Sequence, residues 1–217
     1  MVHRQLAPVV LIGDLVASRE SPDRRRLHRV VEAALADTNA RVSSVEPLEV
    51  TVGDEFQAVY PHLGAALEAA LRTRLALQPE TETRYGIGRG ATTTLDEARG
   101  IKDGPGWWAA RRAIVEVEEQ AERGAMQHVH TAYRLAEGEP DPDGTALAVE
   151  AALQCQDHLV GSLSKRSARL LRGLLEGMTQ RELAAAEGIS PSAVSQRVRA
   201  DGLAVIVRCH ELLRSLP

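Results

Sequence analysis

Two Gly-Asp pairs are the first residues in this sequence whose type and setting suit chemistry. Asp14 follows an apolar run in VVLIGDL, and Asp54 lies between two alternating stretches in LEVTVGDEFQAVY. Two carboxylates held together in a partly closed site repel each other, so one takes up a proton or a cation bridges them. Oxygen-only ligands suit Mg²⁺ or Mn²⁺. Asp14 and Asp54 are therefore predicted metal ligands, and a metal–nucleotide complex would satisfy their charge.

Four further residues are candidates for binding the phosphate groups of such a nucleotide. Ser18 and Arg19 follow Asp14 on a loop that leads into a helix, where backbone N–H groups favour anions. Arg84 and Arg111 would each add a planar cationic fork that matches phosphate oxygens. The structural alternative is that Asp14 only ends a strand, that Asp54 only forms a turn and that Glu55 faces solvent.

A second set of polar residues lies near the end of the chain, in EGISPSAVSQRVR. Gly188 predicts a tight turn, Ser190 a helix cap and Pro191 the first position of a new helix. Val194 and Val198 are its inward positions. The outward residues suit base edges and phosphates in a major groove. The predicted DNA contacts are Ser190, Ser192, Ser195, Gln196, Arg197 and Arg199.

The helix before this one is also well specified. Thr179 and Glu182 have the spacing of a capping box, in which each side chain satisfies a backbone N–H of the other residue. The whole stretch GMTQRELAAAEGISPSAVSQRVR resembles the helix-turn-helix of sigma-factor and LuxR-type promoter readers. The resemblance implies double-stranded DNA as a partner. The alternative is a three-helix unit used only for dimerisation or internal packing.

The elements that must position Asp14 and Asp54 alternate in type. Apolar patterns predict a strand at 9–12, a helix from a Ser21-Pro22 cap, a hairpin with Gly53-Asp54 at its tip, a helix at 63–75 and a strand at 83–88. This β-α-β-β-α-β order is ferredoxin-like, with the first strand between the third and fourth and antiparallel to both. Asp14, Asp54 and Arg84 should then meet at one edge.

The remaining patterns complete an α+β fold with an all-α module at its end. A turn at 103–106 precedes a long helix, 128–135 is a candidate strand, and 138–145 is a surface loop. Trp107 and Trp108 point in different directions on that helix, which favours anchoring residues with one ring exposed. We expect an α+β domain over 1–161 and a helix-turn-helix domain over 162–217.

Charge and composition restrict the class of protein. The 217 residues carry a net charge of −4, but the nine basic and five acidic residues from Ser162 onward make that segment +4 and leave −8 on the rest. A basic module on an acidic body suits a phosphate-bearing partner. The start lacks an export signal, and no apolar run is long enough to cross a bilayer. We expect a cytoplasmic protein without a membrane partner.

Several motifs in order resemble one protein family. VLIGDLVASR, VTVGDEFQAVY, RYGIGRG and DGPGWWAARRA are similar to the SatD family over nearly the entire chain. The resemblance to that family implies no particular biochemical activity. A weaker resemblance links Asp14 and Asp54 to class III nucleotide cyclases and palm domains, which place one metal-binding Asp after the first strand and another at a Gly-Asp hairpin tip. The purine-selecting and transition-state-stabilising residues of cyclases have no assignable counterparts here.

The sequence therefore leaves three hypotheses. The first is a homodimeric transcriptional regulator whose N-terminal domain binds a nucleotide or a divalent metal, or mediates dimerisation. The alternative is an enzyme, a metal-dependent nucleotidyl cyclase-like lyase that uses Asp14 and Asp54. The third is a pure interaction module. Binding is favoured over turnover.

Overall fold

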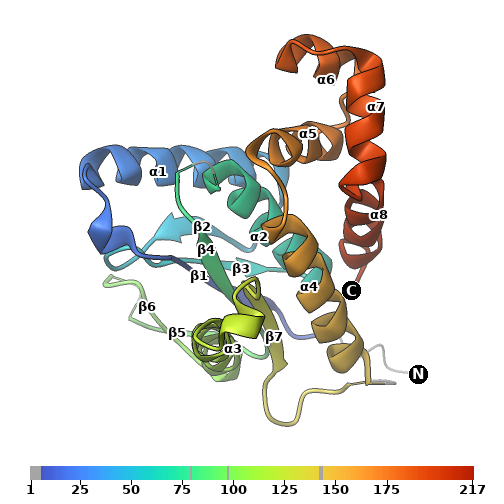
Figure 1. The fold of residues 1–217 in the computed structure, drawn as a ribbon. Helices are drawn as coiled ribbons and strands as arrows, with labels where there is room; N and C mark the ends of the chain where they lie inside the picture. Colours follow the sequence, from blue (N-terminus) through green and yellow to red (C-terminus); the bar gives the residue numbers. More distant parts are fainter. Residues whose placement is uncertain (1–5, 79, 97, 142–143) are drawn as a thin grey trace.

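The computed structural model describes residues 6–78, 80–96, 98–141 and 144–217. The strands are β1 (Val9–Leu15), β2 (Glu46–Val50), β3 (Phe56–Tyr60), β4 (Thr83–Arg89), β5 (Thr93–Asp96), β6 (Ile101–Asp103) and β7 (Thr131–Leu135). The helices are α1 (Arg24–Arg41), α2 (Leu63–Leu77), α3 (Pro105–Ala121), α4 (Thr145–Gly161), α5 (Lys165–Leu175), α6 (Gln180–Glu187), α7 (Pro191–Ala200) and α8 (Leu203–Leu213), with short 3-10 helices at Ser18–Glu20 and Gly124–Met126. The chain is an α+β protein, as predicted (Figure 1). No helix in the described ranges combines the length and apolar character needed to cross a membrane.

The main sheet has the strand order β2-β3-β1-β4-β7. β1 is antiparallel to both β3 and β4, and β7 extends the sheet parallel to β4. The first strand therefore lies between the third and fourth, as the right-handed crossovers predicted. Because β1 is central, its residues are almost continuously buried, whereas the edge strand β2 is mostly not.

The two faces of the sheet are covered differently. Alternate residues of β1 point to opposite faces, so Leu11 joins the large core formed with α1, α2 and α4, while Val10 and Ile12 pack against α3. Figure 1 shows α3 on the opposite side of the sheet from α1 and α2. The face under α3 is therefore only partly covered, and the part over β2 and β3 stays accessible.

Glycines allow α3 to lie unusually close to β4. A Cβ atom at Gly86 would come within 2.2 Å of the Ala110 carbonyl oxygen, and one at Gly88 would come within 2.3 Å of the Ala110 nitrogen. Backbone atoms cannot move aside as side-chain ends can. The glycine run in RYGIGRG therefore serves helix–strand packing.

Among the helices α5 to α8, both ends of α6 and the start of α7 lie where the sequence predicts. The Thr179–Glu182 capping box is present, Ser190 accepts the N–H of Ala193, and Gly188 ends α6 in the left-handed conformation with φ 64°. Their shared core also contains Leu71 and Leu75 of α2 and Val160 of α4. The hydrophobic core of α5 to α8 is thus shared with α2 and α4. The division into two domains after residue 161 stays a prediction.

One local prediction differs from the structure, one hairpin was not predicted, and one predicted loop is only partly described. α1 is capped by Asp23, which accepts the N–H of Arg26, rather than by Ser21, because Pro22 lies before the helix and not in its first turn. The hairpin β5–β6 was not predicted, since its strands are short and mostly exposed. In the predicted loop 138–145, residues 142 and 143 lie outside the described part of the chain.

Candidate functional site

Asp14 and Arg84 meet at the edge of the sheet that the topology predicted. They are direct neighbours in the β1–β4 ladder, and Arg84 donates to both carboxylate oxygens, with Nε–Oδ1 at 3.0 Å and Nη2–Oδ2 at 2.9 Å. Glu118 of α3 lies 3.0 Å from Arg84 Nη1. Such a two-pronged pair is the strong form of an ion pair. Arg84 is therefore engaged by two acids of the chain itself.

Asp54 and Ser18 come together on the other side of this edge. Gly53 and Asp54 are the central residues of a turn closed by the Glu55 N–H and the Val52 carbonyl, and Gly53 has φ 67°. Ser18 is almost fully buried, and its hydroxyl donates to Asp54 Oδ2 at 2.5 Å. The loop that carries Ser18 bends at Ala17, a non-glycine residue with φ 53°. The side chain of Arg19 lies outside the described part of the structure.

The pKa of Asp14 depends on both its burial and the charged groups around it. Burial raises the pKa of Asp14, the hydrogen bonds and charge of Arg84 oppose that shift, and the negative charges of Glu118 and Asp54 add to it. Asp54 is thus close enough to act on Asp14. The predicted convergence of two carboxylates exists, but an arginine already neutralises one of them.

Asp14 and Asp54 could bind a divalent cation only if their present side-chain hydrogen bonds were broken. Both oxygens of Asp14 accept from Arg84, and an oxygen of Asp54 accepts from Ser18. Among the residues that the structure describes, no group of three or more His, Cys, Asp or Glu side chains is placed to hold a metal. A cation at Asp14 would have to displace a bound guanidinium. The Mg²⁺ or Mn²⁺ site stays a prediction.

A large cavity lies next to this edge, on the half-covered face of the sheet. It has a volume of about 870 Å³ and is bounded by β2 and β3, the β5–β6 hairpin and the first turns of α3. Trp107 forms a buried wall, whereas Trp108 is 55% exposed and its indole N–H donates to Asp103 at 2.7 Å. Lys102 pairs with Glu46 at 2.8 Å and so connects the hairpin to β2. The prediction that one tryptophan ring is exposed is confirmed.

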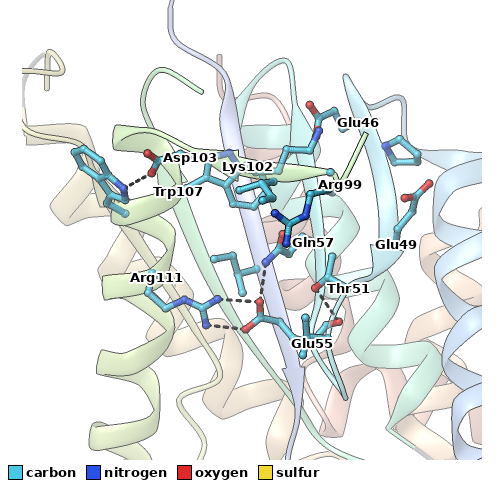
Figure 2. Close-up of a pocket in the computed structure, with 17 residues that line it drawn as sticks. Glu46, Glu49, Thr51, Glu55, Gln57, Arg99, Lys102, Asp103, Trp107 and Arg111 are labelled. Carbon is cyan, nitrogen blue, oxygen red and sulfur yellow. Dashed lines mark hydrogen bonds and ion pairs between the residues drawn. The ribbon is translucent and has the colours of Figure 1, made fainter. Parts of the chain in front are cut away.

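Arg111 lies in this cavity rather than in the Asp14–Arg84 pair. Its guanidinium makes two hydrogen bonds to Glu55, at 2.7 and 2.8 Å, and Glu55 also accepts from Gln57 at 2.7 Å (Figure 2). These bonds raise the pKa of Arg111, and the charge of Asp14 adds to the effect. The cavity and the Asp14 edge are therefore electrostatically connected.

Two acids of this region, Glu55 and Glu118, were not predicted as functional. Glu118 follows Arg111 by seven positions on α3, which places both on one face of the helix. That spacing was a usable signal once the helix was expected beside β4. Glu55 was interpreted as solvent-facing, and its pairing with Arg111 depends on how α3 packs.

The polar flank of α7 is exposed as the apolar spacing requires. Val194 and Val198 are buried, whereas Ser192, Gln196 and Arg199 are exposed and Ser195 is half-buried. Ser190 caps the helix and its hydroxyl lies 2.9 Å from that of Ser192, while Arg197 lies 3.6 Å from Asp201. Within the described residues, Gln196 and Arg199 have no hydrogen-bond or ion-pair partner.

Comparison with solved structures finds only distant similarity. Two structures of a bacterial light-regulated adenylyl cyclase match with TM-scores of 0.45 and 0.44 at 14% and 15% identity, covering 61% and 59% of this chain. This chain spans 44% of the first of those chains and 76% of the second. A Csm1–Csm4 cassette in complex with cA4 matches with a TM-score of 0.31 at 17% identity, over 94% of this chain and 36% of that one. Scores below 0.5 assign neither fold nor function.

Comparison of the sequence is more specific. No protein with a curated description matches this chain. A family model does match, and it spans residues 8–216, from the start of β1 to beyond the end of α8. The match includes the Asp14–Arg84 edge, the tryptophan-lined cavity and the helices α5 to α8. The chain belongs to the SatD family.

Proposed function

We propose that this SatD-family protein binds double-stranded DNA through α7 and acts as a transcriptional regulator. The observation that carries the proposal is the division of α7 into a buried apolar side at Val194 and Val198 and an accessible polar side at Ser192, Gln196 and Arg199. In a helix-turn-helix, the second helix lies in the major groove and its N-terminal residues contact base edges. α6 and α7 are proposed to form that unit.

The charge around α7 supports this proposal. Arg166 and Arg169 of α5 both pair with Glu187, whereas Lys165, Arg181 and Arg199 have no charged partner among the described residues. Unpaired cations suit phosphate groups, which supply a large share of the affinity of DNA-binding proteins. Gln196 and Arg199 suit adenine and guanine edges, respectively.

Substitution of α7 tests the proposal. We expect Arg199→Ala and Gln196→Ala each to weaken binding to a selected DNA site by about 5- to 150-fold, because one good base contact is worth about 1–3 kcal/mol. Binding sites selected from random duplexes would be measured by fluorescence anisotropy at several salt concentrations. A base contact changes sequence preference, whereas a phosphate contact weakens all sequences and lowers the salt slope by about one.

The matched control is Arg123→Ala, which removes the same charge from an exposed position after α3. It should leave affinity and salt slope unchanged. Sequence-selective binding that survives both α7 substitutions would remove α7 as the reading helix. The absence of binding to any selected duplex would remove the proposed function.

A second function, nucleotide binding by the N-terminal domain, is favoured by the cavity beside the Asp14 edge. Its volume of about 870 Å³ lies within the usual range for small-molecule sites. Trp108 offers an exposed ring for stacking, and Arg111 offers a fixed cationic group nearby. The strand order is compatible with a ferredoxin-like, palm-type domain, which we propose for residues 1–161. Cyclase-like turnover at Asp14 and Asp54 is the less favoured form, because Arg84 occupies Asp14.

Nucleotide binding would be measured by calorimetry with ATP and GTP, with and without Mg²⁺ or Mn²⁺. We expect Trp108→Ala to weaken binding by about 5- to 150-fold, because stacking of a base on an aromatic ring is worth about 1–3 kcal/mol. Asp14→Asn and Asp54→Asn would abolish only the increase in nucleotide affinity that depends on the metal ion. Val115→Ala on the exposed side of α3 is the control. Equal affinity in the Trp108→Ala variant would remove the cavity as the base site.

A further inference from the structure

The outer face of α4 is an apolar stripe that the chain leaves uncovered. Its buried residues include Val149, Leu153 and Val160. On the other side of the helix are four exposed residues. The second, third and fourth follow the first by three, seven and eleven positions, so the four lie along one line of the helix. They are Ala148, Ala151, Cys155 and Leu159. No charged side chain belongs to this line.

α8 has an uncovered apolar line of its own. Leu203, Ile206 and Leu213 are buried, whereas Val205 is 63% exposed and Leu212 is 54% exposed, seven positions apart. Isolated exposed apolar residues are common on protein surfaces. A repeated line of them on a helix is typical of a surface that another helix covers.

The two lines border the same seam. α4 and α8 are in contact and lie side by side in Figure 1. Ala152 of α4 and Cys209 of α8 pack against the same core. Burial raises the pKa of the Cys209 thiol, and Cys155 adds to the shift. The uncovered residues of α4 and α8 therefore form one continuous surface, the α4–α8 surface.

The charges beside this surface indicate what covers it. Arg208 and Glu211 of α8 are 68% and 51% exposed and lie 3.0 Å apart. One charge of each sign, a turn apart on the same helix, is self-complementary about a two-fold axis, because Arg208 of one copy can face Glu211 of the other. Isologous dimers require this property.

We propose that the α4–α8 surface binds a second copy of this chain, with α8 packed against α8 of the partner. The dimer itself does not depend on the proposed DNA-binding function. Only its consequence for the spacing of DNA half-sites rests on that function. α8 follows α7 after the two residues Asp201 and Gly202. A two-fold axis through α8 would therefore carry two α7 helices at a fixed separation, which sets the spacing of the DNA half-sites.

The experiment is sedimentation equilibrium of the full chain without DNA over a range of protein concentrations. We expect a dimer whose dissociation constant rises at least about tenfold in Val205→Glu and in Leu212→Glu, because each buries a charge without a partner. Val45→Glu is the matched control, since Val45 is 62% exposed and lies between α1 and β2. It should dimerise like the wild type. Thermal unfolding checks that all variants fold.

The native thiol supplies an independent measurement. Cys155 is exposed and is one of two cysteines in the chain. Its alkylation rate should fall as wild-type protein is concentrated, and should not fall in Leu212→Glu. This proposal is overturned, whatever the DNA result, if the protein is a monomer at every concentration. It is also overturned if neither α8 substitution changes the dissociation constant of the dimer. A dimer that binds no DNA overturns only the proposed function.

Discussion

Replacing Asp157 by alanine is expected to lower the free energy of unfolding by about 3–5 kcal/mol, the cost of breaking a buried ion pair from one side. Arg74 of α2 is only 2% exposed, and its Nη1 atom lies 2.6 Å from Asp157 Oδ1. Without Asp157, the guanidinium would keep its charge inside the protein with no hydrogen-bonded partner. Glu82 is the nearest other acid, 4.0 Å from Arg74 Nε.

Asp157 also supports the start of β7. Its Oδ2 atom accepts the backbone N–H groups of His130 at 2.8 Å and Thr131 at 2.7 Å. Removing the carboxylate would leave these buried donors unsatisfied, which adds to the cost. One side chain thus connects α4, α2 and the parallel edge strand.

Urea denaturation followed by circular dichroism measures this effect. Asp37→Ala is the matched control, because Asp37 forms an exposed pair with Arg41 on α1 and such pairs contribute about 0–1 kcal/mol. Asp157→Asn should fall between the two, since the amide oxygen can still accept a hydrogen bond. If Asp157→Ala and Asp37→Ala unfolded at the same urea concentration, the network would have no structural role.

Replacing Gly88 by alanine is expected to destabilise the protein by about 3 kcal/mol or more, at the upper end of the range for overpacking. The added Cβ would meet the Ala110 nitrogen at 2.3 Å and the Gly106 carbonyl oxygen at 2.4 Å. Both are backbone atoms of α3, so the helix as a whole would have to move away from β4. Trp107 of α3, which packs against Val10 and Ile12 of β1, would then lose part of its contact with the sheet.

The measurement is again urea denaturation, combined with the tryptophan fluorescence of the folded state. Gly124→Ala is the matched control, because a Cβ atom there meets nothing within 4 Å and the backbone φ is not positive. That change should be neutral or stabilise by up to about 1 kcal/mol, through the unfolded chain. A stable Gly88→Ala variant with an unchanged spectrum would contradict the close approach of α3 and β4.

Local signals of the sequence determined both ends of α6 and the start of α7, and the order of the elements determined the arrangement of the first four strands. Thr179 with Glu182 and Ser190 with Pro191 act within a few residues, so a hydrogen bond between near neighbours decides the outcome. The convergence of Asp14 and Arg84 was predictable for a different reason. Chain connectivity and the handedness of crossovers leave few possible strand orders.

Only the tertiary structure decided what these residues bind within the protein. Arg84 holds Asp14 and Glu118, and Arg111 holds Glu55, across separations of many residues. Arg74 and Asp157 pair inside the core although they lie 83 positions apart in the sequence. An ion pair depends on distances of a few ångströms between elements that sequence periodicity does not resolve. For that reason the sequence predicted where charged groups gather, and packing determined which charge each one neutralises.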